Sequence, residues 1–358
     1  MSGLPTTKIE FKSPVSTATP RAERGVLAIV VQDGTGSFNY KEYAVATDVD
    51  ASDYTAANYA IIMRAFEAAP YKVIVVRIAA AGTVANATAI LDNLSYDWLC
   101  SPASGLQSGL VTYVKAQNTP ARARRIKLVA TGAGSVDDMH IVNVANTNVK
   151  LVGESSTTDM VAYLPRIAGI LAACPLNQSV TSYELTDLAD VAAVSNLDTS
   201  ISSGNLCLYR DDSTIRIARG VNTLQTVGGT SNHTEDMKKI CVVEGLDITQ
   251  FEIVTLFKRD YQGKKKNSAD NQAILVGDLL QIFGLLTTDE VLDSYSKPSV
   301  EVNVAAMRQA WASAGIDVTG LTDAQVKNKT YGSQVFLTAT GLKYLDAIED
   351  LSIEIQLG

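Results

Sequence analysis

The chain has 358 residues, 46% of them hydrophobic and 19% charged, which is enough to build the cores of two or three domains. Its net charge of −8 argues against a nucleic-acid binder or an anionic membrane surface, since both need clustered Lys and Arg. The widely spaced cysteines Cys100, Cys174, Cys207 and Cys241 form no CxxC pair, so we expect small buried side chains in a reducing compartment, with neither a zinc knuckle nor a redox pair.

The first residues contain no secretory h-region, and no apolar run of the chain reaches membrane-spanning length. We therefore expect a protein made in a cytoplasm, without direct membrane insertion. Thr7, Ile9 and Phe11 alternate with charged residues, a period of two that predicts a short strand with one apolar face. The Pro- and Ser-rich segment 13–24 then predicts an extended linker, so this strand is tethered away from the body.

The body begins with a β-branched run at 25–31, which is typical of a strand covered on both faces. A helix is expected at 56–69, ended by Pro70, and a second buried strand at 72–78. Strand, helix and strand at this spacing predict a βαβ unit with a right-handed crossover.

The same alternation continues to the C-terminal third. Further helices are expected at 87–94, 109–117, 159–173, 234–244, 248–261, 271–286 and 305–314. Further strands are expected at 96–100, 125–130, 140–144, 149–152, 206–218 and 300–304, with a hairpin around Gly332. The pattern predicts an α/β fold of mixed sheets flanked by helices.

The last residues repeat the pattern of the first. Leu351, Ile353, Ile355 and Leu357 alternate with polar residues, which predicts a second amphipathic strand at a chain end. An isolated strand is marginal in water, so each end must join a sheet. That sheet belongs either to a neighbouring molecule, by β-augmentation, or to the chain's own body, and the pattern alone leaves both open.

Catalytic motifs are weak. Gly34–Ser37 and Gly132–Ser135 each follow a strand, where a phosphate loop would sit, but no third glycine or Walker lysine follows the first, and acidic residues follow the second. His140 is expected in the core or at a sheet edge, and His233 at a helix start, with no G-x-S-x-G elbow to complete a hydrolase. The run Lys264–Lys266 is expected to be a solvated turn, the alternative being a basic patch that meets an acidic face on a neighbouring molecule. The sequence indicates no enzyme, no cofactor and no metal; the alternative is a nucleotide-binding α/β enzyme.

Several segments in order resemble the contractile phage tail sheath family, in the short form of myophages and R-type bacteriocins of Gram-positive bacteria. The opening GLPTTKIEFKSPVSTATPRAERGVLAIVV is similar to the family's N-terminal arm and first strand, and YDWLCSP at 96–102 is similar to its middle segment. The most specific stretch is STIRIARGVNTLQTV at 213–227, and the terminal LDAIEDLSIEIQL ends as these proteins do.

The resemblance implies a structural subunit of stacked hexameric rings, forming a helical sheath around a tail tube and contracting to drive that tube through a cell envelope. It implies a homo-oligomer whose partners are the tube, baseplate and tail terminator proteins, in a phage or phage-tail-like particle assembled in the bacterial cytoplasm. It assigns Thr7, Ile9 and Phe11, and Leu351, Ile353, Ile355 and Leu357, to strand pairing between subunits.

The resemblance also implies a discontinuous inner domain, a middle or outer domain, and extended strand arms at both ends. We expect an arm and linker at 1–24, an α/β body with a more external middle region at 25–235, a tube-facing domain at 236–350 packed with the strands of 25–80, and a C-terminal arm at 351–358. Two segments, Ala305–Ala314 and Leu342–Asp350, are candidates for the helix that contacts the tube.

Overall fold

The computed structural model describes residues 24–119, 122–134 and 136–356. Seven strands form the central sheet in the order β10-β6-β5-β4-β1-β3-β2. They span Val26–Gln32 (β1), Tyr40–Tyr43 (β2), Lys72–Ile78 (β3), Trp98–Cys100 (β4), Lys127–Thr131 (β5), Ile141–Val144 (β6) and Asn205–Leu206 (β10). All neighbouring pairs are parallel except β2 with β3, so the expected βαβ unit of β1 and β3 is confirmed.

Helices cover both faces of this sheet. They are α2 (Ala56–Ala65), α3 (Val84–Leu91), α4 (Gln107–Gln117) and α5 (Met160–Ala173). Alternate residues of β1 divide between two cores: Leu27 and Ile29 pack with α2 and α5, whereas Ala28 and Val30 pack with α3 and α4. This double burial explains why β1 and β3 are continuous apolar runs.

Smaller elements extend the first of these cores. Strands β7 (Asn148–Leu151), β8 (Thr158–Asp159) and β9 (Leu188–Val191) form a three-stranded sheet, β11 (Leu208–Asp211) and β12 (Thr214–Ile217) form a hairpin, and α6 spans Leu197–Ser202. The hairpin turns at Asp212, which has a positive φ of 52°. Its inward side chains Ile215 and Ile217 are buried with Val149 and Leu188, so these elements belong to the body.

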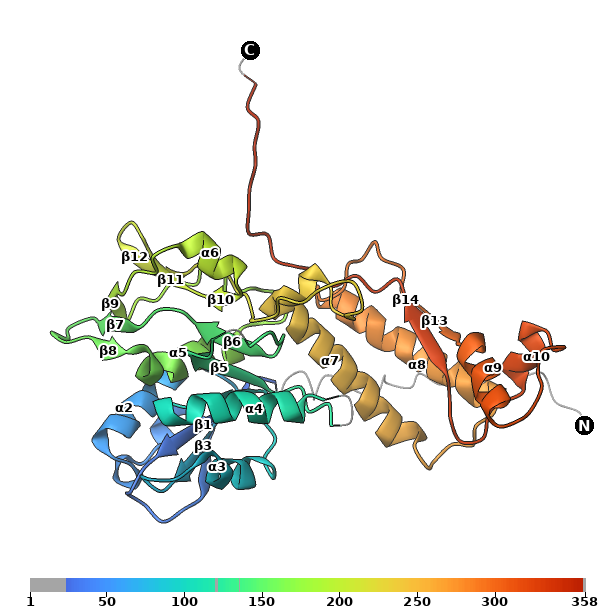
Figure 1. The fold of residues 1–358 in the computed structure, drawn as a ribbon, viewed down its shortest axis with the longest axis horizontal. Coiled ribbons are helices and arrows are strands. Elements are labelled where there is room, and N and C mark those ends of the chain that lie inside the picture. The colour runs from blue at the N-terminus through green and yellow to red at the C-terminus, as the bar shows by residue number, and fades with distance from the viewer. Residues whose placement is uncertain (1–23, 120–121, 135, 357–358) are drawn as a thin grey trace, which may run out of the picture.

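The C-terminal elements form a lobe with its own core. It contains α7 (Ile240–Leu256), α8 (Ala269–Thr288), β13 (Ser299–Val302), α9 (Val304–Ser313), α10 (Asp323–Asn328) and β14 (Leu337–Thr340). Ile248 of α7, Phe283 of α8 and Val300 of β13 share this core. Figure 1 shows the lobe beside the body, with α9 and α10 at its far end. No helix in the described ranges is long and apolar enough to cross a membrane.

Three expectations for this lobe are wrong. The helices expected at 234–244 and 248–261 meet in one helix, α7, which follows a 3-10 turn at Glu235–Lys238 and is continued by a π-helical turn at Phe257–Tyr261. The hairpin expected around Gly332 is a single bridge between Tyr331 and Gln334, and β14 instead pairs antiparallel with β13. Residues Leu342–Asp350, a candidate helix, contain no helix and form one isolated bridge, at Tyr344.

Candidate assembly site

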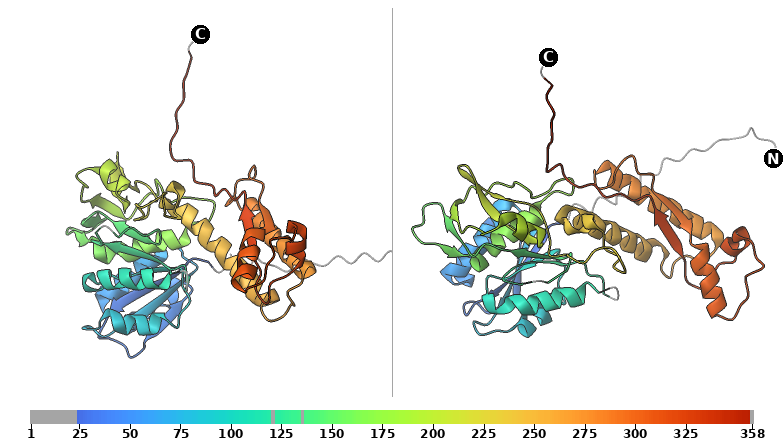
Figure 2. Two further views of the ribbon diagram at one scale, coloured as in Figure 1. Left: turned by 45° about the vertical axis from the view of Figure 1, so that its right-hand side comes forward. Right: turned by 45° about the horizontal axis from the view of Figure 1, so that its top comes forward.

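The candidate assembly residues lie at the two chain ends, and only part of the second is described. Thr7, Ile9, Phe11 and Leu357 lie outside the described residues. Residues 351–356 are an extended segment that pairs with no strand of the described chain, and Figures 1 and 2 show it running away from both the body and the lobe.

The described arm is exposed on both faces. Leu351, Ile353 and Ile355 are 81%, 66% and 77% exposed, and the polar residues between them are exposed as well. Apolar side chains stabilise a folded or assembled state only when they leave water. This arm therefore obtains almost no burial from its own subunit.

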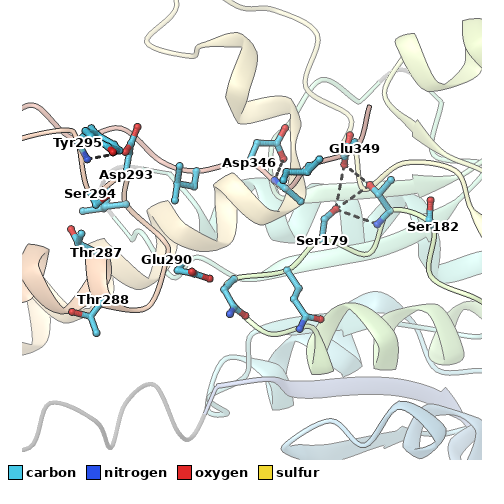
Figure 3. Close-up of a pocket in the computed structure, with 17 residues that line it drawn as sticks. Ser179, Ser182, Thr287, Thr288, Glu290, Asp293, Ser294, Tyr295, Asp346 and Glu349 are labelled. Carbon is cyan, nitrogen blue, oxygen red and sulfur yellow. Dashed lines mark hydrogen bonds between the residues drawn. The ribbon is translucent and has the colours of Figure 1, made fainter. Parts of the chain in front are cut away.

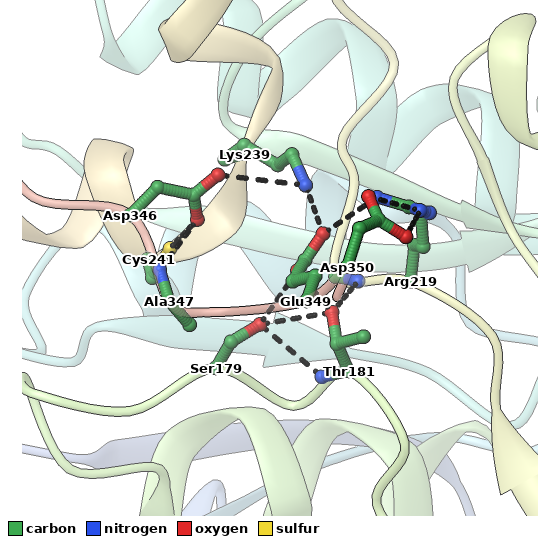
Figure 4. Close-up of polar contacts among 10 residues, drawn as sticks. Ser179, Thr181, Arg219, Lys239, Cys241, Asp346, Ala347, Glu349 and Asp350 are labelled. Atoms are coloured by element: carbon green, nitrogen blue, oxygen red, sulfur yellow. Dashed lines mark hydrogen bonds and ion pairs between the residues drawn. The ribbon is translucent and has the colours of Figure 1, made fainter. Parts of the chain in front are cut away.

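The root of the arm is firmly held, in contrast to the arm itself. The carboxylate of Glu349, only 4% exposed, accepts hydrogen bonds from Arg219 Nη1 at 2.9 Å, from Lys239 Nζ and from Thr181 Oγ1 (Figure 4). In the next residue, Asp350, Oδ2 accepts a hydrogen bond from Arg219 Nη2 at 2.7 Å. This hydrogen bonding and the nearby guanidinium charge lower the pKa of Asp350. The chain leaves the surface directly after this clamp.

A second pair of contacts lies just before the clamp. Asp346 Oδ2 is 3.5 Å from Lys239 Nζ, and its Oδ1 accepts a hydrogen bond from Cys241 Sγ at 3.2 Å. Burial, followed by this contact with Asp346, raises the pKa of the Cys241 thiol to about 12. Residues 346–350 are thus fixed to the start of α7 and to the neighbouring body.

The arm root also borders a groove between the body and the C-terminal lobe. The groove has a volume of about 830 Å³ and is lined by segments 177–182, 287–295 and 345–349 (Figure 3). Most of its lining residues carry a hydroxyl, amide or carboxylate group, but its surface is about half apolar, and the side chains of Tyr295 and Ile348 are 92% and 97% exposed. Ser179 Oγ contacts Thr181 Oγ1 and Glu349, and no histidine lines the groove, so these residues do not form a Ser-His catalytic pair.

A buried network of charges joins α7 to the central sheet. Glu244 pairs with Arg24, and its other oxygen is 3.3 Å from Lys127 Nζ. Lys127 Nζ also lies 2.7 Å from Asp247 Oδ2, and His140 Nε2 lies 3.1 Å from Asp247 Oδ1. Each buried charge has an opposite partner, which is the condition for keeping charges in an interior.

His140 is therefore a buried, charged residue. Burial lowers its pKa, but the charge of Asp247 and hydrogen bonds to Asp138 and Asp247 outweigh burial and raise it to about 9. The same network lowers the pKa of Asp247, where the charges of Lys127 and His140 overcome the effect of burial. The sequence indicated the buried position of His140 but not its pairing with Asp247, which lies 107 residues further along the chain.

The first candidate phosphate loop is occupied by the protein's own contacts. Asp33, which is 1% exposed, accepts hydrogen bonds from Thr35 N, Thr55 N and Oγ1, and Asn58 Nδ2. A Cβ at Gly36 would lie 2.9 Å from the carbonyl oxygen of Asp53, so this loop is packed against the body. The buried carboxylate of Asp33 stands where a phosphate loop presents N–H donors, which disfavours an anion.

The acidic residues that follow the second loop are also held by the protein's own contacts. Asp137 accepts hydrogen bonds from Gln225 N, Thr226 N and Thr226 Oγ1, which lower its pKa to about 2. The run Lys264–Lys266 is exposed in a turn, as expected. Cys100 and Cys207 are buried, Cys174 and Cys241 are half-buried, and all four are free thiols. Across residues 24–356, apart from the three undescribed ones, no group of three His, Cys, Asp or Glu could hold a metal ion.

Comparison with known proteins gives a consistent result. No family model matches the sequence. The chain is 28% identical over the full length of both proteins to the tail sheath protein of the Clostridium phage phiCD119. The resemblance to the contractile tail sheath family is thereby confirmed over the whole chain.

Solved structures share the fold at low sequence identity. The sheath tail protein of Desulfitobacterium hafniense superposes with a TM-score of 0.66 at 13% identity, covering 83% of this chain and 94% of that one. The sheath tail protein of Listeria innocua gives 0.63 at 14% identity, covering 89% and 94%. The anti-feeding prophage sheath in its contracted state gives 0.68 at 12% identity, covering 99% of each chain. The expected mixed α/β fold is confirmed as that of sheath proteins.

Proposed function

We propose that this chain is the structural subunit of a contractile tail sheath, which polymerises as stacked hexameric rings around a tail tube and contracts to drive that tube through a cell envelope. Full-length similarity to a phage tail sheath protein supports the structural role. The observation that carries the linkage mechanism is the C-terminal arm, which leaves a clamped root with both faces exposed. Such a segment is suited to pairing with a neighbouring subunit.

The sheet of β13 and β14 is the proposed acceptor for these arms. A two-stranded sheet is marginal by itself, and each of its strands pairs only with the other within the described chain. Thr338, Ala339 and Thr340 of β14 are exposed. An arm strand from a neighbour would supply backbone partners for the free N–H and C=O groups of such an edge.

One arm contact is close to energetic balance, and the lattice supplies the remainder. Burying Leu351, Ile353, Ile355 and Leu357 would contribute about 6–12 kcal/mol. Ordering the eight residues 351–358 costs about 12 kcal/mol. Once one arm is bound, further contacts between the same subunits become intramolecular. The combined affinity of these contacts therefore greatly exceeds the affinity of a single arm contact.

The same proposal indicates which parts of the chain contact the tail tube and the neighbouring subunits. The body and lobe have the rigid cores that a moving subunit requires, and the arms maintain attachment during movement. Of the two candidate tube contacts, Ala305–Ala314 remains, within and just beyond α9, because Leu342–Asp350 is not a helix. We place the N-terminal arm strand of Thr7, Ile9 and Phe11 in a neighbouring subunit too, and propose baseplate and terminator proteins at the sheath ends. Assembly takes place in the bacterial cytoplasm.

Electron microscopy of the purified protein tests this function. We expect rings or tubes from the full chain, and a folded, soluble subunit without tubes after deletion of 351–358. Ile355→Asp should also prevent tubes, because it puts a charge on the apolar face of the arm, whereas Gln356→Asp on the polar face is the matched control. A stable monomer that hydrolyses nucleotide would instead favour an α/β enzyme.

A further inference from the structure

The first two turns of α7 contact the roots of both chain ends. Residue 24, where the N-terminal segment enters the body, pairs with Glu244. Residues 346 and 349, where the C-terminal segment leaves, pair with Lys239 immediately before the helix. Glu244 comes five positions after Lys239, which corresponds to a rise of about 7.5 Å along a helix.

The N-terminal root is anchored by side chains and by a close backbone turn. Arg24 Nε lies 3.1 Å from Glu244 Oε2, and Arg24 Nη1 donates to the carbonyl oxygen of Cys174 at 3.3 Å. Gly25 has a φ of 94°, and a Cβ there would lie 2.5 Å from the carbonyl oxygen of Ala172, so only glycine fits this turn. The amide of Gly25 donates to Asp97 at 2.8 Å.

The C-terminal root explains an otherwise unfavourable residue. A lysine at a helix N-terminus opposes the helix dipole, which favours anions there. Lys239 occupies that position and pairs with Glu349 and Asp346, whose carboxylates supply the negative charge at the start of α7. The helix end, the lysine and the arm root are therefore matched to one another.

The helix itself is fixed to the sheet just beyond these two contacts. Asp247, one turn after Glu244, pairs with Lys127 of β5 and with His140 beside β6. Charged hydrogen bonds in a buried setting are among the stronger polar contacts of proteins. The segment Lys239–Asp247 is thus tied at one end to the C-terminal root, in its middle to the N-terminal root, and at its far end to the central sheet.

We propose that segment 239–247 is a mechanical bridge that passes tension between the two arms of one subunit, through the Arg24–Glu244 and Lys239–Glu349 pairs. This inference rests on the proposed function, in which the arms connect subunits. Tension entering at residue 24 divides between the backbone, which leads into β1, and the Arg24–Glu244 pair, which leads into α7; the second part leaves α7 through Lys239. The load on β1 is thereby reduced while the sheath changes length, and the ion pairs of Glu244 and Asp247 with Lys127 spread the remainder to β5.

Pulling on single full-length subunits from their two ends tests the bridge. In the unmodified chain we expect a first rupture, before the sheet unfolds, in which residues 341–350 come off and about 35 Å of chain is released, at roughly 3.5 Å per residue. Lys239→Met should lower the force of this first rupture, and together with Arg219→Met the separate event should be lost. Arg24→Met should lower the force at which the sheet unfolds, because tension then enters β1 directly.

Arg308→Met is the matched control, since it breaks the ion pair with Asp323 at the far end of the lobe, outside residues 341–350 and away from α7, and should change neither force. Arg24→Met leaves Glu244 facing Lys127; if it fails to fold, Arg24→Lys, which keeps the charge without the forked contact, takes its place. An unchanged force in either the Lys239 or the Arg24 variant overturns the bridge. The pulling experiment uses single subunits and so is independent of assembly. If the force is unchanged but the unmodified chain forms tubes, the bridge alone is refuted. If the unmodified chain forms no tubes, the proposed function is refuted.

Discussion

Raising the pH from 6 to 8.5 is expected to weaken the folded subunit through His140. Its pKa is raised from 6.5 to about 9 in the fold, where Asp247 and Asp138 stabilise the charged ring against burial. A raised pKa contributes stability that is fully present below pH 6.5 and is lost as the pH rises through about 9. The buried carboxylate of Asp247 then loses one of its two cationic partners.

The size of the effect follows from the shift. A change of 2.5 in pKa, from 6.5 to 9, corresponds to roughly 3 kcal/mol when the titration is complete. Between pH 6 and 8.5 only part of the titration is covered, so the free energy of unfolding should fall by about 2 kcal/mol. The range stops at 8.5 because the buried thiols, among them Cys174 and Cys241, have raised pKa values and add their own pH dependence above about 9.

Urea unfolding of the monomeric subunit, followed by circular dichroism at several pH values, measures this change. His140→Gln should lower stability at pH 6 and remove the dependence between pH 6 and 8.5. His233→Gln replaces the other histidine and should keep the full dependence. The reasoning would be refuted by an unmodified protein that is equally stable at both pH values, or by an equal fall in the His140→Gln variant.

Two further predictions concern packing and hydrogen bonding. Gly169→Ala should destabilise the fold by about 1–3 kcal/mol, because the new Cβ would lie 2.3 Å from the carbonyl oxygen of Ala65 where α5 crosses α2. Gly277→Ala on α8, where a Cβ meets no atom within 4 Å, should instead stabilise the fold by up to about 1 kcal/mol. Thermal unfolding measures both changes, and equal shifts in the two variants would contradict the reasoning. Asp33→Ala should cost about 2–3 kcal/mol by leaving its donors unpaired, measured by urea unfolding against the exposed Asp48→Ala, which should be neutral.

The sheet strands could be predicted from sequence because their pattern is local. The β-branched runs at 25–31 and 72–78 lie within one residue of β1 and β3, since a strand buried on both faces needs apolar side chains throughout. The helix α5 was also expected at nearly its observed bounds. In these elements local propensity and tertiary packing agree.

The errors occur where distant residues decide the conformation. Gly245 and Asp247 suggest a break in a helix, yet α7 continues through both. Gly245 is there because Val291 packs closely against it: a Cβ would lie 2.9 Å from Val291 Cγ1. Asp247 is there because it pairs with Lys127 of the sheet. Likewise, Glu349 suggested part of a helix, whereas its partners hold it in an extended root. No period in the sequence reveals such long-range ion pairs.

The arm strands remain predictions, and a helical reconstruction of the assembled tubes tests them most directly. We expect residues 351–357 to run as a strand along the edge of β13 or β14 of a neighbouring subunit, with the backbone hydrogen-bonded across the contact. If the reconstruction instead shows the segment after Asp350 folded onto its own subunit, linkage by strand exchange is contradicted.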